Sequence, residues 1–178
     1  MFRSVLPILA AVALVSCAAG PTSPGGSGPA TVESSAAGAA FDAHDFAWST
    51  VTGGGAISGA LNYHQGVVRY TCQGSDVLLT PQTAWSRRRM IILYGSANAA
   101  AAPVSIVRAR TPSAGTGDYA RFVRRTTCDM ANRFSFRGLP DGSWFVITIA
   151  KPVDGAGEPM AVTRRVETHG GLISVSLS

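Results

Sequence analysis

The sequence predicts a mainly β protein, folded as a single antiparallel β-sandwich of about seven strands with one short helix. Three observations predict this class. Beyond residue 41, short apolar segments recur between Gly- and Pro-containing turns, several with alternating apolar and polar residues. The length of 178 residues suits one domain of ordinary size. The composition, 46% hydrophobic and 14% charged, excludes a chain that is disordered throughout.

The first 16 residues are predicted to form an export signal. Arg3 precedes an apolar run from Val5 to Val15. As a helix this run would be roughly 16 Å long, too short for a bilayer core of about 30 Å. A basic start, a short apolar run and small residues after it are typical of a signal peptide.

The end of this signal resembles the bacterial lipobox, in the residues Leu14-Val15-Ser16-Cys17. The resemblance implies cleavage before Cys17 and a diacylglycerol group on its sulfur. In such lipoproteins an Asp after the Cys favours the inner membrane, and here Ala18 stands in that place. We therefore expect a lipid-anchored protein of the bacterial outer membrane, on its periplasmic or outer surface. The alternative is an ordinary signal peptide that happens to contain a Cys.

Residues 17–40 are predicted to form a lipidated, flexible tether. Residues 18–40 are mostly Pro, Gly, Ser and Ala, and Glu33 is their one charged residue. Such a segment cannot bury enough apolar surface to offset its ordering entropy, and its average span would be roughly 25 Å. Phe41, Phe46 and Trp48 end this composition, so the folded domain is expected at 41–178.

Seven segments of that domain are predicted strands. The clearest is residues 133–137, where Phe134 and Phe136 alternate with polar residues and should share one buried face. Residues 144–150 are apolar on both faces, which predicts a central strand. The seven segments are 56–63, 67–72, 77–81, 133–137, 144–150, 160–166 and 173–177.

The segment from Thr83 to Tyr94 lacks a period of two and is predicted to be the short helix. Thr83 would cap its first turn, Trp85 and Ile92 would share a stripe, and residues 87–89, all Arg, would point outward. A strand is the alternative, since Ile-Ile-Leu-Tyr also favours sheets. Segments rich in Gly, Ala, Ser, Asn and Pro predict loops at 95–103 and 111–118.

A motif of turn residues and aromatic residues lies between Thr127 and Val146. Its residues are Asp129, Asn132, Phe134, Phe136, Leu139, Pro140, Gly142 and Trp144. This motif resembles the carboxypeptidase regulatory-like domains. The resemblance implies a transthyretin-like sandwich, a hairpin turn at Asp129 and Asn132, and two Phe rings in the core. Such domains are mostly appended modules that do not carry the chemistry of the domains beside them.

The chain has three Cys. With Cys17 lipidated, Cys72 and Cys128 remain, and export would place them in an oxidising compartment. We predict a disulfide between them, closing a loop of about 57 residues and stabilising the fold by roughly 4 kcal/mol. Two buried free thiols are the alternative. No His lies at a short ligand spacing from either Cys, so no metal site is expected.

The search for catalytic motifs finds none. The chain lacks the HExxH, GxSxG, SxxK and phosphate-loop patterns, so no cofactor is expected either. His44, His64 and His169 are predicted to be exposed residues near loops.

Arginines are frequent in the second half of the chain and could form a basic patch on one sheet. Such a patch would bind an anionic partner, and a solvated sheet face is the alternative. The formal net charge of +5 is too small for a typical nucleic-acid binder, so no nucleic-acid partner is expected. The candidate residues are Arg121, Arg124, Arg125, Arg133, Arg137, Arg164 and Arg165.

These observations predict a non-enzymatic cell-envelope lipoprotein that acts as a binding or scaffolding module. Its contacts would be the membrane, through the lipid on Cys17, and an envelope protein or an anionic polysaccharide. The alternative is a small periplasmic hydrolase with a loop-borne active site, which requires His64, His169 and an Asp to converge within hydrogen-bond reach. A subunit of a larger envelope assembly is a third alternative.

Overall fold

Strand β8 (Gly142–Pro152) is the centre of the larger of two sheets in the computed structural model, which describes residues 40–112 and 117–178. It pairs antiparallel with β9 (Met160–Thr168) along one edge and with β4 (Asp76–Pro81) along the other. The central position predicted for residues 144–150 is therefore confirmed.

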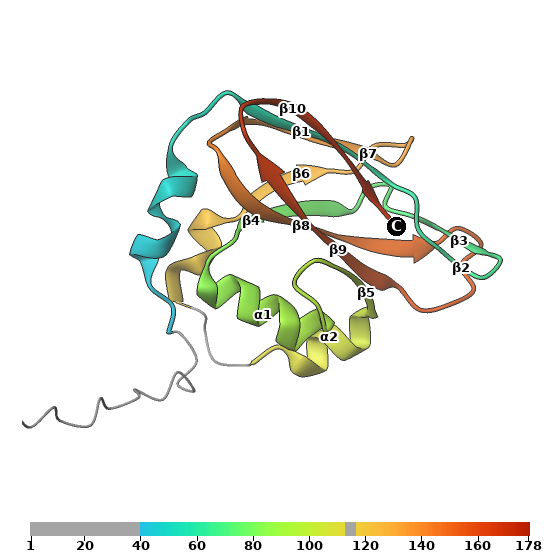
Figure 1. Cartoon of the computed structure of the whole chain (residues 1–178). Helices are drawn as coiled ribbons and strands as arrows, with labels where there is room; N and C mark the ends of the chain where they lie inside the picture. The colour runs from blue at the N-terminus through green and yellow to red at the C-terminus, as the bar shows by residue number, and fades with distance from the viewer. Residues whose placement is uncertain (1–39, 113–116) are drawn as a thin grey trace, which may run out of the picture. The chain divides into compact units, whose positions relative to one another are not determined.

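The larger sheet has the order β2–β3–β8–β4–β6, and β9 and β5 continue it beyond β8 (Figure 1). Its pairs in the described residues are antiparallel. The remaining members are β2 (His64–Gln65), β3 (Val68–Thr71), β5 (Ala99–Pro103) and β6 (Arg124–Thr127).

The smaller sheet has the order β10–β1–β7 and packs over the larger one as a sandwich. Its strands are β1 (Gly55–Leu61), β7 (Arg133–Leu139) and β10 (Gly171–Leu177). β1 and β7 are antiparallel, but β1 and β10 are parallel. The mainly β sandwich is thus confirmed, while the expectation of purely antiparallel pairing is wrong for this one pair.

The core explains why β8 is apolar on both faces. Trp144, Val146 and Ala150 point into the space between the sheets. Phe145 and Ile147 point to the opposite side, where they meet Met90 of the helical layer. Phe134 and Phe136 lie on the inner face of β7, 5% and 6% exposed, as their alternation predicted.

Helix α1 (Ala84–Tyr94) covers the outer face of the larger sheet and confirms the predicted helix. Thr83 Oγ1 accepts from Ser86 N at 3.2 Å, and Thr83 N donates to Ser86 Oγ at 2.8 Å. Gly95 ends the helix with a left-handed φ of 81°, which glycine adopts without steric cost.

The described residues hold more elements than the sequence predicted. β5 occupies part of the loop expected at 95–103, and α2 (Val104–Arg110) packs beside α1 (Figure 1). Two 3₁₀ helices, η1 (Ala43–Thr50) and η2 (Gly117–Phe122), also occur, so the expectation of one helix was too low. β2 and β6 are the other additional strands.

An aromatic cluster joins η1, η2 and the start of α1. Phe46 is fully buried there and stacks on Phe122 with centroids 5.1 Å apart. Phe41 and Tyr119 both contact Trp85. Within the described ranges no helix is both long and apolar enough to cross a membrane.

The turn at Asp129 and Asn132 connects the two sheets instead of closing a hairpin. β6 pairs with β4 in the larger sheet, while β7 pairs with β1 in the smaller one. The hairpin implied by the family resemblance is therefore wrong. The turn residues still act locally, because Asp129 Oδ1 accepts from Ala131 N at 2.8 Å and from Arg133 N at 2.7 Å.

Candidate ligand-binding site

A cleft of about 410 Å³ lies at the Pro152 end of β8, beside the hairpin of β2 and β3. We call it the tyrosine cleft, after its two aromatic side chains. Its lining residues are Leu61, Asn62, Tyr63, His64, Gly66, Arg69, Tyr70, Asn132 and Val153.

The short hairpin places these side chains. Gly66 has a left-handed φ of 59°, which permits a tight turn in which His64 pairs with Arg69. Tyr70 N then donates to Tyr63 O at 3.2 Å, so the two tyrosines are held next to each other across the hairpin. Beyond them, Val153 N donates to Arg69 O at 2.9 Å and ties the hairpin to the end of β8.

The two tyrosine rings pack edge to face, with centroids 5.0 Å apart and an interplanar angle of 64°. Tyr70 is buried, and its hydroxyl donates to Gln65 Oε1 at 3.2 Å. Tyr63 is half-buried and leaves part of its ring open to the cleft. Burial raises the pKa of the Tyr63 phenol, and the neighbouring Tyr70 raises it further, so the hydroxyl stays protonated at neutral pH.

Polar groups surround this aromatic floor. Asn62, His64 and Arg69 are exposed. Asn132 is fixed, because its Oδ1 accepts from Thr71 Oγ1 at 2.6 Å and from Cys72 N at 2.9 Å. The lining contains no Asp or Glu. An aromatic face beside amide, imidazole and guanidinium donors can stack on the apolar face of a sugar ring and bind its hydroxyls.

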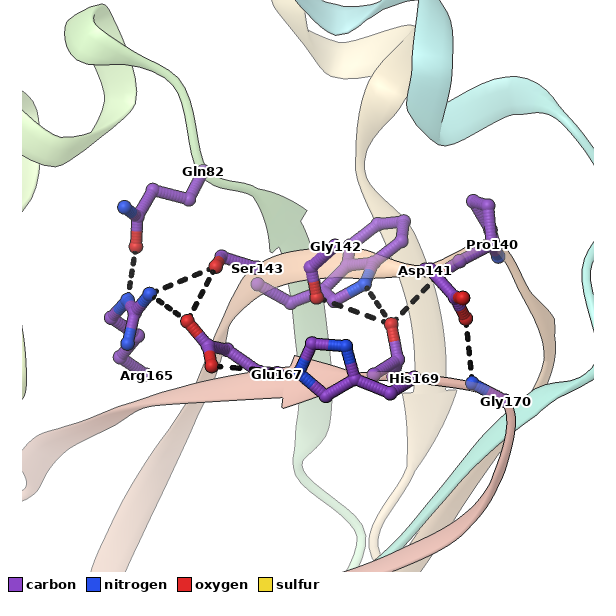
Figure 2. Close-up of polar contacts among 11 residues, drawn as sticks. Gln82, Pro140, Asp141, Gly142, Ser143, Arg165, Glu167, His169 and Gly170 are labelled. Atoms are coloured by element: carbon purple, nitrogen blue, oxygen red, sulfur yellow. Dashed lines mark hydrogen bonds and ion pairs between the residues drawn. The ribbon is translucent and has the colours of Figure 1, made fainter.

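A second polar cluster lies at the Gly142 end of β8 (Figure 2). Arg165 Nε donates to Gln82 Oε1 at 2.5 Å, and Arg165 Nη2 donates to Ser143 Oγ at 2.9 Å. Arg165 also forms an ion pair with Glu167, whose other oxygen lies 3.7 Å from His169 Nε2. The hydrogen bond from Arg165, helped by one from Ser143, lowers the pKa of Glu167.

A neighbouring set of hydrogen bonds holds the loops at this end of β8. Buried Trp144 donates through Nε1 to Thr168 Oγ1 at 3.1 Å, and Thr168 Oγ1 donates to Pro140 O at 2.7 Å. Gly170 N donates to Asp141 Oδ1 at 2.6 Å (Figure 2). These groups satisfy one another, so this end of the sheet is a structural support, whereas the polar rim of the tyrosine cleft is exposed.

The structure places His64 and His169 at opposite ends of β8, in the tyrosine cleft and beside Glu167. Eleven strand residues span roughly 30 Å, far beyond hydrogen-bond reach. The convergence that a hydrolase requires is therefore not found. His44, His64 and His169 are all exposed, as predicted. The described part of the chain also contains no group of three or more His, Cys, Asp or Glu arranged to hold a metal ion.

The seven arginines of the predicted basic patch are spread over several elements. Arg133 and Arg137 are exposed on β7, opposite the Phe pair, as predicted. Arg121 pairs with Asp118 at 2.7 Å, and Arg125 lies 3.6 Å from Asp76. An anionic partner for this set stays a prediction.

The other three of these arginines bind protein groups. Half-buried Arg124 donates to Ser49 O at 2.9 Å and to Gly138 O at 3.2 Å, and its guanidinium lies over the Trp144 ring. Arg164 donates to Ser176 O at 3.2 Å. Arg165 belongs to the cluster around Glu167. These interactions join segments of the fold that lie apart in the sequence.

The predicted disulfide between Cys72 and Cys128 is present, with Cα atoms 5.7 Å apart. It joins the residue after β3 to the turn between the sheets, next to Asn132. Cys17, the export signal at 1–16 and nearly all of the tether at 17–40 lie outside the described residues.

Sequence reasoning missed the tyrosine cleft. The available signal was a tyrosine on each side of a glycine turn, Tyr63 and Tyr70, with polar residues beside each. Recognising it requires the hairpin register, which brings Tyr63 and Tyr70 together, and the turn before β7, which brings Asn132.

The fold is similar to that of a solved Pseudomonas aeruginosa protein described as a "putative carbohydrate binding protein". The match covers 77% of this chain and 96% of that chain, with a TM-score of 0.52 and 22% sequence identity. At this identity the likeness shows the fold alone. No protein-family model matches the sequence, and no curated protein matches it. Membership of the carboxypeptidase regulatory-like family therefore stays a prediction.

Proposed function

We propose that this chain is a non-enzymatic module that binds carbohydrate in the tyrosine cleft. The observation that carries the proposal is the half-buried Tyr63 ring beside exposed Asn62, His64 and Arg69. Sugar-binding sites need an apolar surface for the ring and fixed polar groups for its hydroxyls, and this cleft offers both. Arg69 and the absence of acids in the lining favour a sugar that carries a carboxylate, in keeping with an anionic polysaccharide partner.

Two further facts support the proposal. The Pseudomonas aeruginosa protein of similar fold carries a carbohydrate-binding description. The cleft also has a preformed frame, because the disulfide and the Asn132 hydrogen bonds fix its inner wall before any ligand arrives. A preformed site loses less side-chain entropy on binding.

The direct test is a screen of neutral and uronic-acid oligosaccharides, followed by calorimetry with the best ligand. We expect Arg69→Ala to weaken binding by about tenfold or more, since a hydrogen bond to a charged group contributes roughly 1.5–3 kcal/mol. Tyr63→Ala should also weaken binding, because it removes the aromatic surface on which the sugar ring stacks. Val67→Ala, on a hairpin residue that is 99% exposed outside the lining, and Arg133→Ala on β7 are the matched controls. Binding that is equal in wild type and Tyr63→Ala would reject this site.

We also propose that the module is held at the outer membrane by a lipid on Cys17. The support is the lipobox sequence and the tether composition after it. In a Gram-negative host, the full chain should incorporate labelled palmitate and fractionate with the outer membrane. Cys17→Ser should lose the label, and an unlabelled wild-type chain would disprove the anchor.

A further inference from the structure

The solvent-facing side of the helical layer has an unusual charge balance. Residues 82–112, which include α1, β5 and α2, contain five arginines and no Asp or Glu. The salt bridges found among the described residues involve none of these five arginines. The five are Arg87, Arg88, Arg89, Arg108 and Arg110.

The arginines of α1 share their side of the helix with exposed isoleucines. Arg87 and Arg88 lie one turn before Ile91 and Ile92, so the four side chains form one surface. The exposed fractions of Ile91 and Ile92 are 45% and 56%. The opposite side of α1 is buried against the sheet through Met90 and Leu93, so this surface cannot turn inward.

Helix α2 extends this surface. Ile106 is 41% exposed, and Arg108 and Arg110 are exposed. Arg110 Nη1 donates to Leu93 O at 3.2 Å, which fixes α2 to the end of α1. Both helices lie on the side of the larger sheet away from β1, β7 and β10 (Figure 1). We call the exposed Arg and Ile side chains of α1 and α2 the helix face.

The acidic residue Glu158 contacts this layer. Glu158 precedes β9, and its Oε1 accepts from Ser105 N at 3.3 Å, in the first turn of α2. It is tied to a backbone donor there. Its single negative charge is outnumbered by the five arginines of residues 82–112, so the helix face is cationic at neutral pH.

We propose that the helix face docks on an anionic lipid surface, with the arginines at the phosphate groups and the isoleucines at the boundary of the acyl chains. Arginines alone would fit any polyanion. Exposed isoleucines next to them favour lipid, because a bilayer offers apolar groups below its anionic headgroups and a hydrated polymer does not. The arrangement is that of an interfacial surface, independent of the sugar cleft at the end of β8.

The test uses the full chain carrying Cys17→Ser, so that no acyl chain contributes. Flotation is measured with vesicles of phosphatidylcholine alone and with an equimolar mixture of phosphatidylcholine and phosphatidylglycerol. The vesicles of phosphatidylcholine alone measure any affinity that does not depend on headgroup charge. This includes the affinity of the apolar run from Val5 to Val15. The ratio of the two partition coefficients isolates the anionic contribution.

We expect this ratio to fall by at least about tenfold in Arg87→Glu/Arg88→Glu, since each basic residue near a charged bilayer contributes about 1 kcal/mol. Arg133→Glu/Arg137→Glu changes the net charge equally on another element and should leave the ratio within about twofold. Ile91→Ser/Ile92→Ser should weaken binding to the anionic vesicles, and about 0.5 M NaCl should remove the preference.

Circular dichroism verifies that each exposed double variant is folded. Equal partitioning into both kinds of vesicle would overturn the proposal. Equal losses in the two arginine variants would also overturn it, because net charge alone would then explain the binding. Retention on an acidic polysaccharide such as alginate without any preference for anionic vesicles would assign the helix face to a polymer and reject the lipid.

Discussion

The side chain of Asn132 holds the turn between β6 and β7 against the end of β3. Its Oδ1 accepts from both Thr71 Oγ1 and Cys72 N. Its backbone is left-handed, with φ at 60°, and among the described residues it is the one non-glycine with this conformation. Asn adopts this region more readily than other non-glycine residues, which explains why the turn works without a glycine.

Substitutions of Asn132 should separate the contribution of its side-chain hydrogen bonds from that of its left-handed backbone. We expect Asn132→Ala to lower the free energy of unfolding by about 3 kcal/mol, from two lost hydrogen bonds and the cost of a left-handed alanine. Asn132→Gly should cost about 1 kcal/mol less, because glycine removes only the strain. Urea denaturation measures both, and equal losses would show that backbone strain is unimportant here.

The Glu167 carboxylate contributes stability that depends on pH. Its pKa is lowered in the folded chain by the hydrogen bond from Arg165, so folding favours the ionised form. That contribution is present above the ordinary pKa of about 4.5 and is lost as the pH falls through the lowered value. The difference in Tm between wild type and Glu167→Gln should therefore be largest at neutral pH and disappear in acid. A difference that stays constant below pH 4 would contradict this account.

Helix α1 owes its start to the residues around Thr83. Thr83 and Ser86 form a reciprocal pair of hydrogen bonds, and buried Ser86 Oγ also donates to Pro81 O at 2.8 Å. Thr83→Ala should lower the free energy of unfolding by about 1 kcal/mol, as for other N-cap losses. Ser105→Ala, at an exposed position in α2, is the control and should change little. Equal stability of Thr83→Ala and wild type would show that packing alone starts the helix.

At the scale of elements, the predictable parts of the chain were those with a local pattern. Phe134 and Phe136 alternate with polar residues, which predicted β7. Thr83 can cap a helix, and the segment after it has no period of two, which predicted α1. Ala99–Pro103 has four alanines, which give no alternation, and its strand exists through pairing with β9. Residues 56–63 were predicted as a strand, but the parallel pairing of β1 with β10 depends on contacts distant in the sequence.

The candidate site could be predicted less well than the fold. Its members come from the end of β1, the β2–β3 hairpin, the turn before β7 and the segment after β8. No single segment contains a recognisable motif, and Asn132 reaches the cleft only because its turn connects the sheets instead of closing a hairpin. The disulfide was predictable because two cysteines remained after Cys17 was assigned.

At the scale of the whole molecule, the disulfide links the larger sheet to the turn that leads into the smaller one. Cys72 and Cys128 are 56 positions apart, so the loop that they close is long. We expect Cys72→Ala/Cys128→Ala to lower the free energy of unfolding by roughly 4 kcal/mol, mainly by freeing the unfolded chain. Guanidinium unfolding of this variant and the oxidised wild type measures the loss. A loss below about 1 kcal/mol would mean that the pair is not a main stabilising link.

The parallel pairing of β1 with β10 has a consequence for the order of folding. Gly55 pairs with Gly171, so the partners lie more than a hundred residues apart in the chain. The β4–β6, β8–β9 and β2–β3 pairs join segments that are closer in sequence, and loop closure slows the more distant pairing. We expect amides of β8 and β9 to gain protection before those of β1 in pulsed hydrogen exchange. During refolding the outer surface of the larger sheet would then form first, while the inner faces of both sheets stay exposed to aggregation until β10 arrives.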